Sequence, residues 1–128
     1  MDKIAVLIVD NSRLTRRIIE RSLGQAGIEL GKVVGASNGA EALAAMHDDK
    51  FDLVLCDIAM PVMDGLEFVR RVPTIDSAKG VPIVMITSEG GESQVVQAIT
   101  AGAQGYIRKP FTSAQLREQV LPLLRKRP

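Results

Sequence analysis

Five short apolar segments recur along the chain, and most of them show no polar alternation. They lie at residues 4–9, 32–36, 53–56, 83–86 and 105–107. The segments at 4–9, 53–56 and 83–86 are uninterrupted, which is typical of strands covered on both faces. The segment at 32–36 carries the weakest signal. The pattern predicts a sheet whose central strands are buried.

Amphipathic helical patterns fill the gaps between these segments. They are predicted at about residues 12–26, 38–46, 65–72, 92–101 and 112–124. Asn38 followed by Glu41, and Thr112 followed by Gln115, have the spacing of a capping box at a helix start. Pro122 falls inside the last pattern and predicts a bend or an early end of that helix.

The strict alternation of strand and helix predicts the fold class. Five strand–helix pairs in 128 residues imply an α/β fold, in which a doubly wound parallel sheet has right-handed crossovers and helices on both faces. The length fits one domain, and the chain contains no linker, repeat or low-complexity segment. We expect a single domain over residues 1–128.

Composition and charge exclude several classes of function. Sixteen Lys and Arg against fifteen Asp and Glu give a net charge of +1, which predicts neither a nucleic-acid partner nor binding to an anionic membrane. The longest apolar runs are too short to span a bilayer, and the start of the chain lacks the features of a signal peptide. One cysteine, Cys56, fits a reducing compartment, so we expect a cytoplasmic protein.

Polar side chains follow four of the five apolar segments. Asp10 and Asn11 come after the first, Asp57 after the third, Thr87 after the fourth, and Lys109 after the fifth. The carboxyl ends of parallel strands meet at one edge of the sheet, where ligands bind in open α/β folds. We expect these groups to converge on one pocket.

The converging groups suit phosphoryl transfer. Asp57 can act as a carboxylate nucleophile that forms an acyl phosphate. Asp10 and Asp57 offer the hard oxygen ligands that Mg²⁺ prefers. Lys109 supplies a positive charge to one phosphoryl oxygen, and the Thr87 hydroxyl supplies a hydrogen bond to another.

These residues stand in motifs that resemble those of the response-regulator receiver domain, most closely the stand-alone chemotaxis type. The motifs lie at residues 7–12, 57–65, 86–89 and 105–111, and the similarity runs from residue 4 to about 124. The resemblance implies a flavodoxin-like (βα)5 sheet with strand order 2-1-3-4-5. That order places the ends of the first and third strands side by side.

The resemblance also implies a role for each site residue. Asp57 would accept a phosphoryl group from a histidine kinase or a histidine phosphotransfer domain. Asp57, Asp10 through water, Asn11 directly and the backbone carbonyl of Ala59 would hold Mg²⁺. We expect no effector domain, so the signal would pass by protein binding to a downstream target that the sequence does not name.

A second set of residues would bind the phosphoryl group and respond to it. Thr87 and Lys109 would contact its oxygens, and the Lys109–Pro110 peptide bond would be cis. Tyr106 would move inward when Thr87 engages the phosphoryl group. The expected output face combines the fourth helix, the fifth strand and the fifth helix, reached through a flexible Gly90–Gly91 loop.

Two departures from the family pattern leave alternatives open. Asn11 stands where a second acid is usual, so Mg²⁺ binding should be weakened, and Asn11 serves either as a helix N-cap alone or as a cap and a ligand. The alternative interpretation is a degenerate receiver that acts as a phosphorylation-independent interaction domain. Ala59 has no polar side chain to guide water, which leaves the lifetime of the phosphoryl group open.

An enzyme with a turnover substrate is not expected. Phosphatases with an aspartate nucleophile need an acid or base two residues after it, and Ala59 cannot serve. The chain would catalyse only its own phosphorylation and slow hydrolysis. The Asp64–Gly65 pair is interpreted as turn chemistry and not as part of a site.

Overall fold

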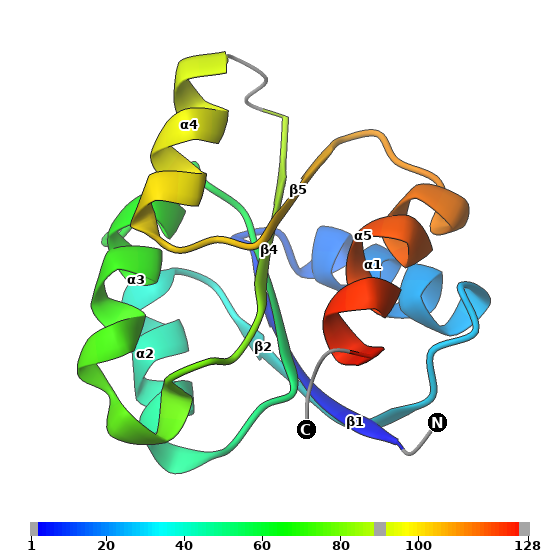
Figure 1. Cartoon of the computed structure of the whole chain (residues 1–128), viewed down its shortest axis with the longest axis horizontal. Helices are drawn as coiled ribbons and strands as arrows, with labels where there is room; N and C mark the ends of the chain where they lie inside the picture. Colours follow the sequence, from blue (N-terminus) through cyan, green and yellow to red (C-terminus); the bar gives the residue numbers. More distant parts are fainter. Residues whose placement is uncertain (1–2, 89–91, 126–128) are drawn as a thin grey trace.

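A five-stranded parallel sheet lies between two layers of helices in the computed structural model, which describes residues 3–88 and 92–125 (Figure 1). The strands are β1 (Ile4–Val9), β2 (Leu30–Ala36), β3 (Leu53–Cys56), β4 (Ile83–Thr87) and β5 (Gly105–Arg108). The helices are α1 (Arg13–Gln25), α2 (Gly39–Asp48), α3 (Gly65–Arg71), α4 (Glu92–Ala101) and α5 (Ser113–Arg125). Two 3₁₀ turns, η1 (Val72–Thr74) and η2 (Asp76–Ala78), follow α3.

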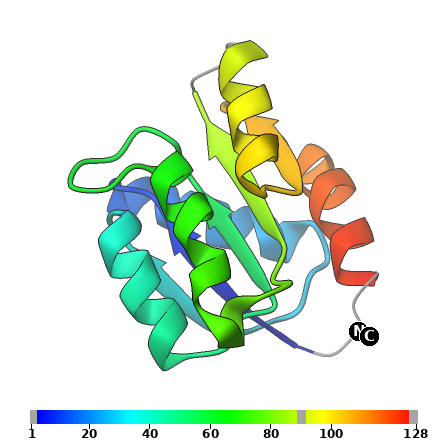
Figure 2. The same cartoon turned by 60° about the vertical axis from the view of Figure 1, so that its left-hand side comes forward.

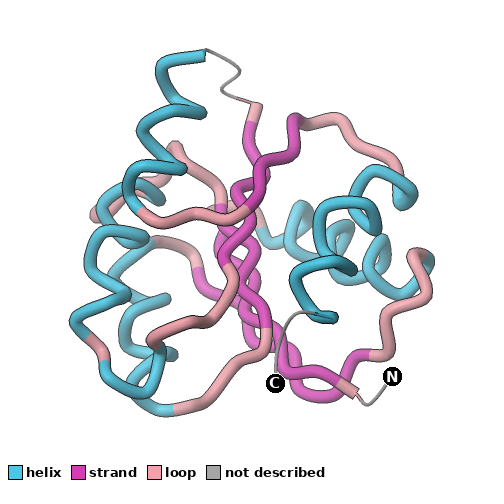
Figure 3. Tube along the Cα trace, viewed as in Figure 1, coloured by secondary structure: helices cyan, strands magenta, loops and turns pink. Residues whose placement is uncertain are grey.

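The strand order is β2-β1-β3-β4-β5, with every neighbouring pair parallel. Helices α2, α3 and α4 cover one face of the sheet, and α1 and α5 cover the other (Figures 1 and 3). Both the α/β fold class and the order 2-1-3-4-5 are confirmed. Among the described helices, none is long and apolar enough to cross a membrane.

The uninterrupted apolar strands supply two hydrophobic cores, one on each face. Alternate residues of a strand point to opposite faces. Leu7 of β1 and Phe68 of α3 belong to the core under α2–α4, whereas Ile8 of β1 and Leu116 of α5 belong to the core under α1 and α5. Because both faces of β1, β3 and β4 are buried, neither face tolerates polar residues.

Local capping fixes where the helices begin. Asn38 Oδ1 accepts a hydrogen bond from the Glu41 N–H at 3.0 Å. Thr112 and Gln115 bond reciprocally, each side chain accepting from the other's main-chain N–H at 3.1 and 2.9 Å. The capping box predicted at α5 is therefore confirmed. At α2 the Asn38 cap is confirmed, but the Glu41 side chain accepts from the Ser37 N–H at 2.9 Å and not from that of Asn38.

Two element boundaries differ from the prediction. Helix α5 continues through Pro122 to Arg125, so the expected early end is wrong. Its buried Leu116 and Val120 anchor the helix on the sheet in the turns before Pro122. Strand β2 begins at Leu30, two residues earlier than predicted. It is an edge strand that pairs only with β1, so most of its residues are partly exposed and its first residues carry no continuous apolar signal.

Candidate functional site

The carboxyl ends of the strands bring together the charged side chains singled out in the sequence. Lys109 Nζ lies 2.7 Å from Asp10 Oδ2 and 3.4 Å from Asp57 Oδ2. Both aspartates are buried, with 2% of Asp10 and 9% of Asp57 exposed. Thr87 is fully buried at the end of β4, and its carbonyl oxygen accepts from the Lys109 N–H at 3.0 Å. The predicted convergence is therefore present.

Strand pairing explains why the two aspartates are neighbours. Val9 of β1 is the register partner of Cys56 of β3, so Asp10 and Asp57 follow paired residues. The Asp57 N–H continues the ladder by donating to the Val9 carbonyl at 2.9 Å. The crossover between β1 and β3 thus sets the two carboxylates side by side without help from the loops.

Main-chain groups orient one oxygen of each carboxylate. Asp10 Oδ1 accepts from the Ser12 N–H at 2.9 Å, and Asp57 Oδ1 accepts from the Ile58 N–H at 2.8 Å. The second oxygen of each, Oδ2, faces Lys109. Each acid therefore presents one oxygen to the pocket while the other is held in place.

Burial and the neighbouring acids keep Cys56 inert. The thiol donates to the Asp57 carbonyl oxygen at 3.1 Å. Desolvation raises the pKa of Cys56 well above its ordinary value, and the negative charges of Asp57, Asp10 and Asp64 raise it further. A thiol is reactive only as the thiolate, so Cys56 is a packing residue beneath the site.

The comparisons with known proteins agree with this geometry. A model of the response regulator receiver domain matches residues 6–121. The chemotaxis protein CheY1 of Helicobacter pylori is 42% identical over 118 residues, which cover 90% of this chain and 92% of that protein. The chain belongs to the receiver-domain family.

Solved receiver structures share the fold. The Vibrio cholerae chemotaxis protein CheY4 has a TM-score of 0.84 and 34% identity, covering 95% of this chain and 99% of that one. The receiver domain of the Pseudomonas aeruginosa sensor histidine kinase PA1611 has a TM-score of 0.85 at 23% identity, with 98% and 100% coverage, and holds a magnesium ion in its active site cleft. The chain is thus a response regulator of two-component signalling, of chemotaxis type.

Asn11 is not the N-cap of α1. It is exposed in the turn after β1, and the cap is Ser12, whose Oγ accepts from the Thr15 N–H at 3.2 Å. The Ser12 N–H donates to the Asp10 carboxylate. The helix therefore starts one residue later than it would if Asn11 were the cap. The cap role predicted for Asn11 is therefore wrong.

The oxygen donors of this receiver fit a magnesium ion. Among the residues that the structure describes, no group of three His, Cys, Asp or Glu side chains gathers as a metal cluster. Mg²⁺ does not need one, because it binds through one or two carboxylates and keeps several waters. Asp10 and Asp57 supply those carboxylates, and the Asn11 amide and Ala59 carbonyl lie in the loops that directly follow them.

The remaining predicted residues lie on the β5 side of the receiver. The Lys109–Pro110 bond is cis, as the resemblance implied. Tyr106 of β5 pairs in register with Met85 of β4 and is half-buried against the core under α2–α4. Gly90 and Gly91 lie outside the described residues.

Gly65 packs against the end of the strand that carries Asp57. Its N–H donates to the Ile58 carbonyl at 2.8 Å, and a Cβ at this position would collide with the Asp57 carbonyl oxygen. Asp64 caps α3 by accepting from the Glu67 N–H at 2.9 Å. Asp64 and Gly65 thus form the start of α3, and Gly65 has the added role of letting α3 approach β3.

Sequence reasoning missed Arg16. Its guanidinium Nη1 donates to the Asp10 carbonyl at 2.5 Å and lies across Gly35 of β2, where a Cβ would sit 2.9 Å from Arg16 Nε. The Arg16 side chain thereby stabilises the turn after β1 that contains Asp10. The sequence offers no signal for it, because Arg16 is one of several arginines on a helix with the pattern of a solvated face.

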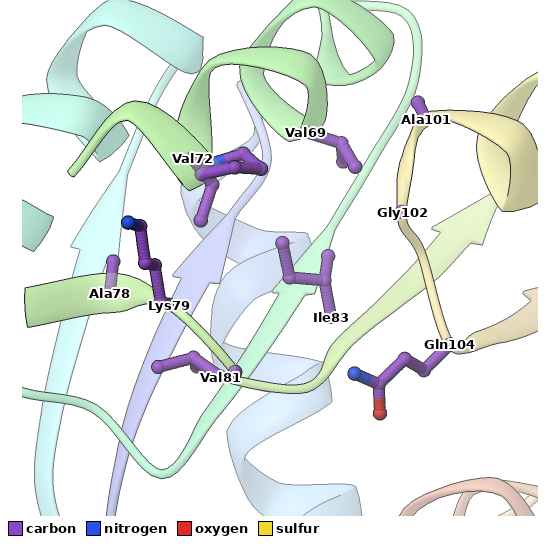
Figure 4. Close-up of a pocket in the computed structure, with 11 residues that line it drawn as sticks. Val69, Val72, Ala78, Lys79, Val81, Ile83, Ala101, Gly102 and Gln104 are labelled. Carbon is purple, nitrogen blue, oxygen red and sulfur yellow. The ribbon is translucent and has the colours of Figure 1, made fainter. Parts of the chain in front are cut away.

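A second hollow in the molecule has no chemistry of this kind. An apolar cavity of about 140 Å³ lies near the start of β4, lined by Val69, Val72, Ile83 and Gly102 among others (Figure 4). Its polar neighbours are Lys79 and Gln104, and it has no acid. The acidic pocket at the carboxyl edge is therefore the site that carries reactive groups.

Proposed function

We propose that this receiver accepts a phosphoryl group on Asp57 from a histidine kinase or a histidine phosphotransfer domain and signals by binding a downstream protein. The observation that carries the proposal is the placement of Lys109 between two buried carboxylates, one of which follows the central strand β3. Cys56 is a free, buried cysteine, which agrees with a protein that functions in the reducing cytoplasm.

Asp57 Oδ2 is the nucleophile in this proposal. It attacks the phosphorus, the phosphorus–nitrogen bond of the donor breaks, and the electron pair returns to the imidazole nitrogen. Ile58 holds Asp57 Oδ1 and so fixes the direction of attack. Lys109 stays near the transferred group and balances its charge. The Thr87 hydroxyl donates to a second phosphoryl oxygen.

Mg²⁺ completes the proposed pocket through Asp10, Asp57, Asn11 and the carbonyl of Ala59. When bound, the ion neutralises charge between the anionic nucleophile and the incoming phosphoryl group. Asn11 contributes an oxygen but no charge, so we infer weaker binding than a third carboxylate would give. The protein catalyses only its own phosphorylation and hydrolysis, and it turns over no separate substrate.

The output face consists of α4, β5 and α5. A groove of about 310 Å³ between β5 and α5 is lined by Tyr106, Arg108 and Gln119 among others. Thr87 and Tyr106 lie on adjacent strands, so a movement of the Thr87 hydroxyl toward the phosphoryl group frees space beside β5. This is a shift between two populated states, which the partner protein reads.

Uptake of phosphate from acetyl phosphate tests the proposal. The wild type should incorporate one phosphate in the presence of Mg²⁺ and far less in EDTA, and Asp57→Asn should incorporate none. Asp64→Asn, which alters an exposed acid in the next loop, is the matched control and should behave as wild type. A wild type that takes up no phosphate with or without Mg²⁺ would instead be a phosphorylation-independent interaction domain.

A further inference from the structure

Helix α1 begins with positive charges where helices favour negative ones. Its first turn has no acid and carries Arg13 and Arg16. The macrodipole is positive at a helix N-terminus, so a cation there costs free energy unless another contact offsets the cost. The two arginines have different surroundings, because Arg13 is exposed and Arg16 is half-buried.

The contact that holds Arg16 is with the main chain of Asp10. Side chains of a helix lean toward its N-terminus, so an arginine in the first turn points back to the preceding loop. Arg16 Nη1 donates to the Asp10 carbonyl oxygen at 2.5 Å and lies 3.5 Å from Ser37 Oγ. Hydrogen bonds from a charged donor are stronger than those between neutral groups. Arg16 thus joins the turn after β1 to the loop after β2.

The hydrogen bond from Arg16 completes the set that fixes Asp10. The Asp10 N–H donates to the Ala36 carbonyl at 3.0 Å, and the carboxylate Oδ1 accepts from the Ser12 N–H at 2.9 Å. Within the part of the chain that the structure describes, Arg16 is the donor to the carbonyl oxygen of this buried residue. These bonds leave the second carboxylate oxygen, Oδ2, facing Lys109.

The turn held by Arg16 lies at the edge of the sheet that carries the site. The start of α1 (blue) and the loop between β3 and α3 (green) lie at this same edge (Figure 2). Asp10 follows Val9, which is the register partner of Cys56, so Asp10 is the neighbour of Asp57. A shift of the turn after β1 therefore moves one of the two carboxylates relative to the other.

Gly35 of β2 leaves the space that the Arg16 side chain occupies. A Cβ at residue 35 would lie 2.9 Å from Arg16 Nε and 3.3 Å from Arg16 Cδ. Arg16 cannot yield to such an atom without straining the hydrogen bond at its tip. Gly35 is exposed on an edge strand and its φ is not positive, so neither burial nor backbone conformation requires glycine there. The passage of Arg16 explains it.

We propose that Arg16 is a positioning residue for the magnesium site: it holds the main chain of Asp10 so that Oδ2 stays directed at the pocket, and Gly35 makes room for it. The inference rests on the proposed function, in which Asp10 holds Mg²⁺. Arg16 acts through Asp10 and not on the ion. Removing a partner that orients a metal ligand typically weakens metal binding by about 10- to 100-fold, which sets the size of the expected effect.

A positioning role and a purely electrostatic role predict opposite signs. If Arg16 acted only through its charge, its removal would lessen the repulsion of Mg²⁺ and tighten binding. If Arg16 positions Asp10, its removal weakens binding even though a positive charge is lost. Arg17 is the exposed neighbour with the same charge, and among the described residues it makes no hydrogen bond to Asp10. Arg17→Met is therefore the matched control for Arg16→Met.

The first measurement is amide hydrogen exchange in EDTA, which needs no metal. The Ser12 N–H reports the carboxylate of Asp10, and the Ile58 N–H reports that of Asp57. Arg16→Met should speed the exchange of the Ser12 N–H about tenfold, the effect of losing about one net hydrogen bond. The exchange of the Ile58 N–H should stay within about twofold of wild type, because Arg16 does not hold Asp57. Arg17→Met should change neither rate.

The second measurement is Mg²⁺ titration followed by the amide shifts around Asp57. Arg16→Met should raise the dissociation constant about tenfold and Gly35→Ala about threefold. The double variant should bind no more weakly than Arg16→Met alone, because both changes disrupt the same contact. Half-maximal uptake of phosphate from acetyl phosphate should then need about tenfold more Mg²⁺ in Arg16→Met, with a maximal rate within about twofold of wild type.

Urea unfolding in EDTA establishes that each variant is folded. Gly35→Ala keeps the test decisive if Arg16→Met does not fold, because alanine is favoured over glycine in a strand. Mg²⁺ binding by folded Arg16→Met that is equal to or tighter than that of wild type overturns the assignment of Arg16 and leaves Asp57 as phosphoacceptor. Equal weakening by Arg17→Met, or unchanged binding by Gly35→Ala, overturns it as well.

The proposed function can fail separately. A wild type that binds Mg²⁺ with the expected order of variants but takes up no phosphate contradicts the proposed function and leaves the role of Arg16 standing. A wild type that binds no Mg²⁺ overturns both.

Discussion

The main chain of Gly65 in α3 packs so closely on Asp57 that a Cβ there would overlap the Asp57 carbonyl oxygen. The contact ties the start of α3 to the end of β3 and leaves no room for a side chain. Methyl addition at Gly65 therefore has to displace the backbone of Asp57 or of α3.

Gly65→Ala should lower the free energy of unfolding by about 2–3 kcal/mol, since overpacked sites cost this much. Gly24→Ala is the control, because Gly24 lies inside α1 and a Cβ added there would meet no atom within 4 Å. That substitution should raise stability by about 0.5–1 kcal/mol. Urea unfolding of both variants measures these changes in the free energy of unfolding. Equal effects of the two substitutions would mean that Gly65 is not constrained by Asp57.

Asn11→Asp should tighten Mg²⁺ binding by about tenfold, or about 1.4 kcal/mol, because a carboxylate adds a full charge where the amide adds only a dipole. The same change should slightly destabilise the metal-free protein, since a third acid crowds Asp10 and Asp57. Calorimetric titration with Mg²⁺ measures the first effect and thermal melting in EDTA the second. Gln104→Glu, an exposed change near the start of β4, controls for added charge. Equal Mg²⁺ affinities of wild type and Asn11→Asp would remove Asn11 from the ligand set.

Cys56 should make the protein less stable at alkaline pH. Its pKa is raised in the folded state, first by burial and then by the nearby acids, so the folded thiol stays protonated while the unfolded thiol ionises above about pH 8.5. The stability contributed by the neutral thiol is complete below that pH and is lost as pH rises toward the folded pKa, at about 1.4 kcal/mol per pH unit. Cys56→Val should lose less stability between pH 7 and pH 10 in urea unfolding. Parallel losses in the two proteins would contradict the raised pKa.

Phosphorylation should reach beyond the pocket to the output face. Backbone NMR with beryllofluoride, a phosphoryl mimic, should give its largest distant shifts between Ser88 and Tyr106, because Thr87 connects the pocket to β5 and α4. Asp57→Asn treated in the same way provides the baseline. If only residues that touch the mimic shift, the coupling from Thr87 to Tyr106 does not exist.

The parts of this molecule that sequence predicts are those set by burial and by strand order. β1, β3 and β4 are buried on both faces, so their apolar runs mark them unambiguously, and the polar residue after each run then marks the site. Asp10, Asp57 and Lys109 meet because parallel strands end together, which requires no knowledge of side-chain packing.

The incorrect sequence predictions concern places where several neighbouring residues compete for the same hydrogen bond or the same position in the fold. Asn11 and Ser12 are both good caps, and the choice of Ser12 depends on Asp10 accepting the Ser12 N–H. Pro122 is a helix breaker by propensity, but the packing of α5 on the sheet prevails over it. Arg16 acts across elements, through a hydrogen bond to the Asp10 carbonyl that no local pattern records.

The most direct test of the phosphoacceptor is to locate the phosphoryl group on the wild-type chain. After reaction with acetyl phosphate and Mg²⁺, reduction of the acyl phosphate with borodeuteride leaves a stable deuterium label on the modified residue, which peptide mass spectrometry identifies. We expect one labelled residue, Asp57, and no label in Asp57→Asn. Labelling of Asp10 or Asp64 in the wild type, or an unlabelled Asp57 in a protein that has taken up phosphate, would contradict the assignment of Asp57.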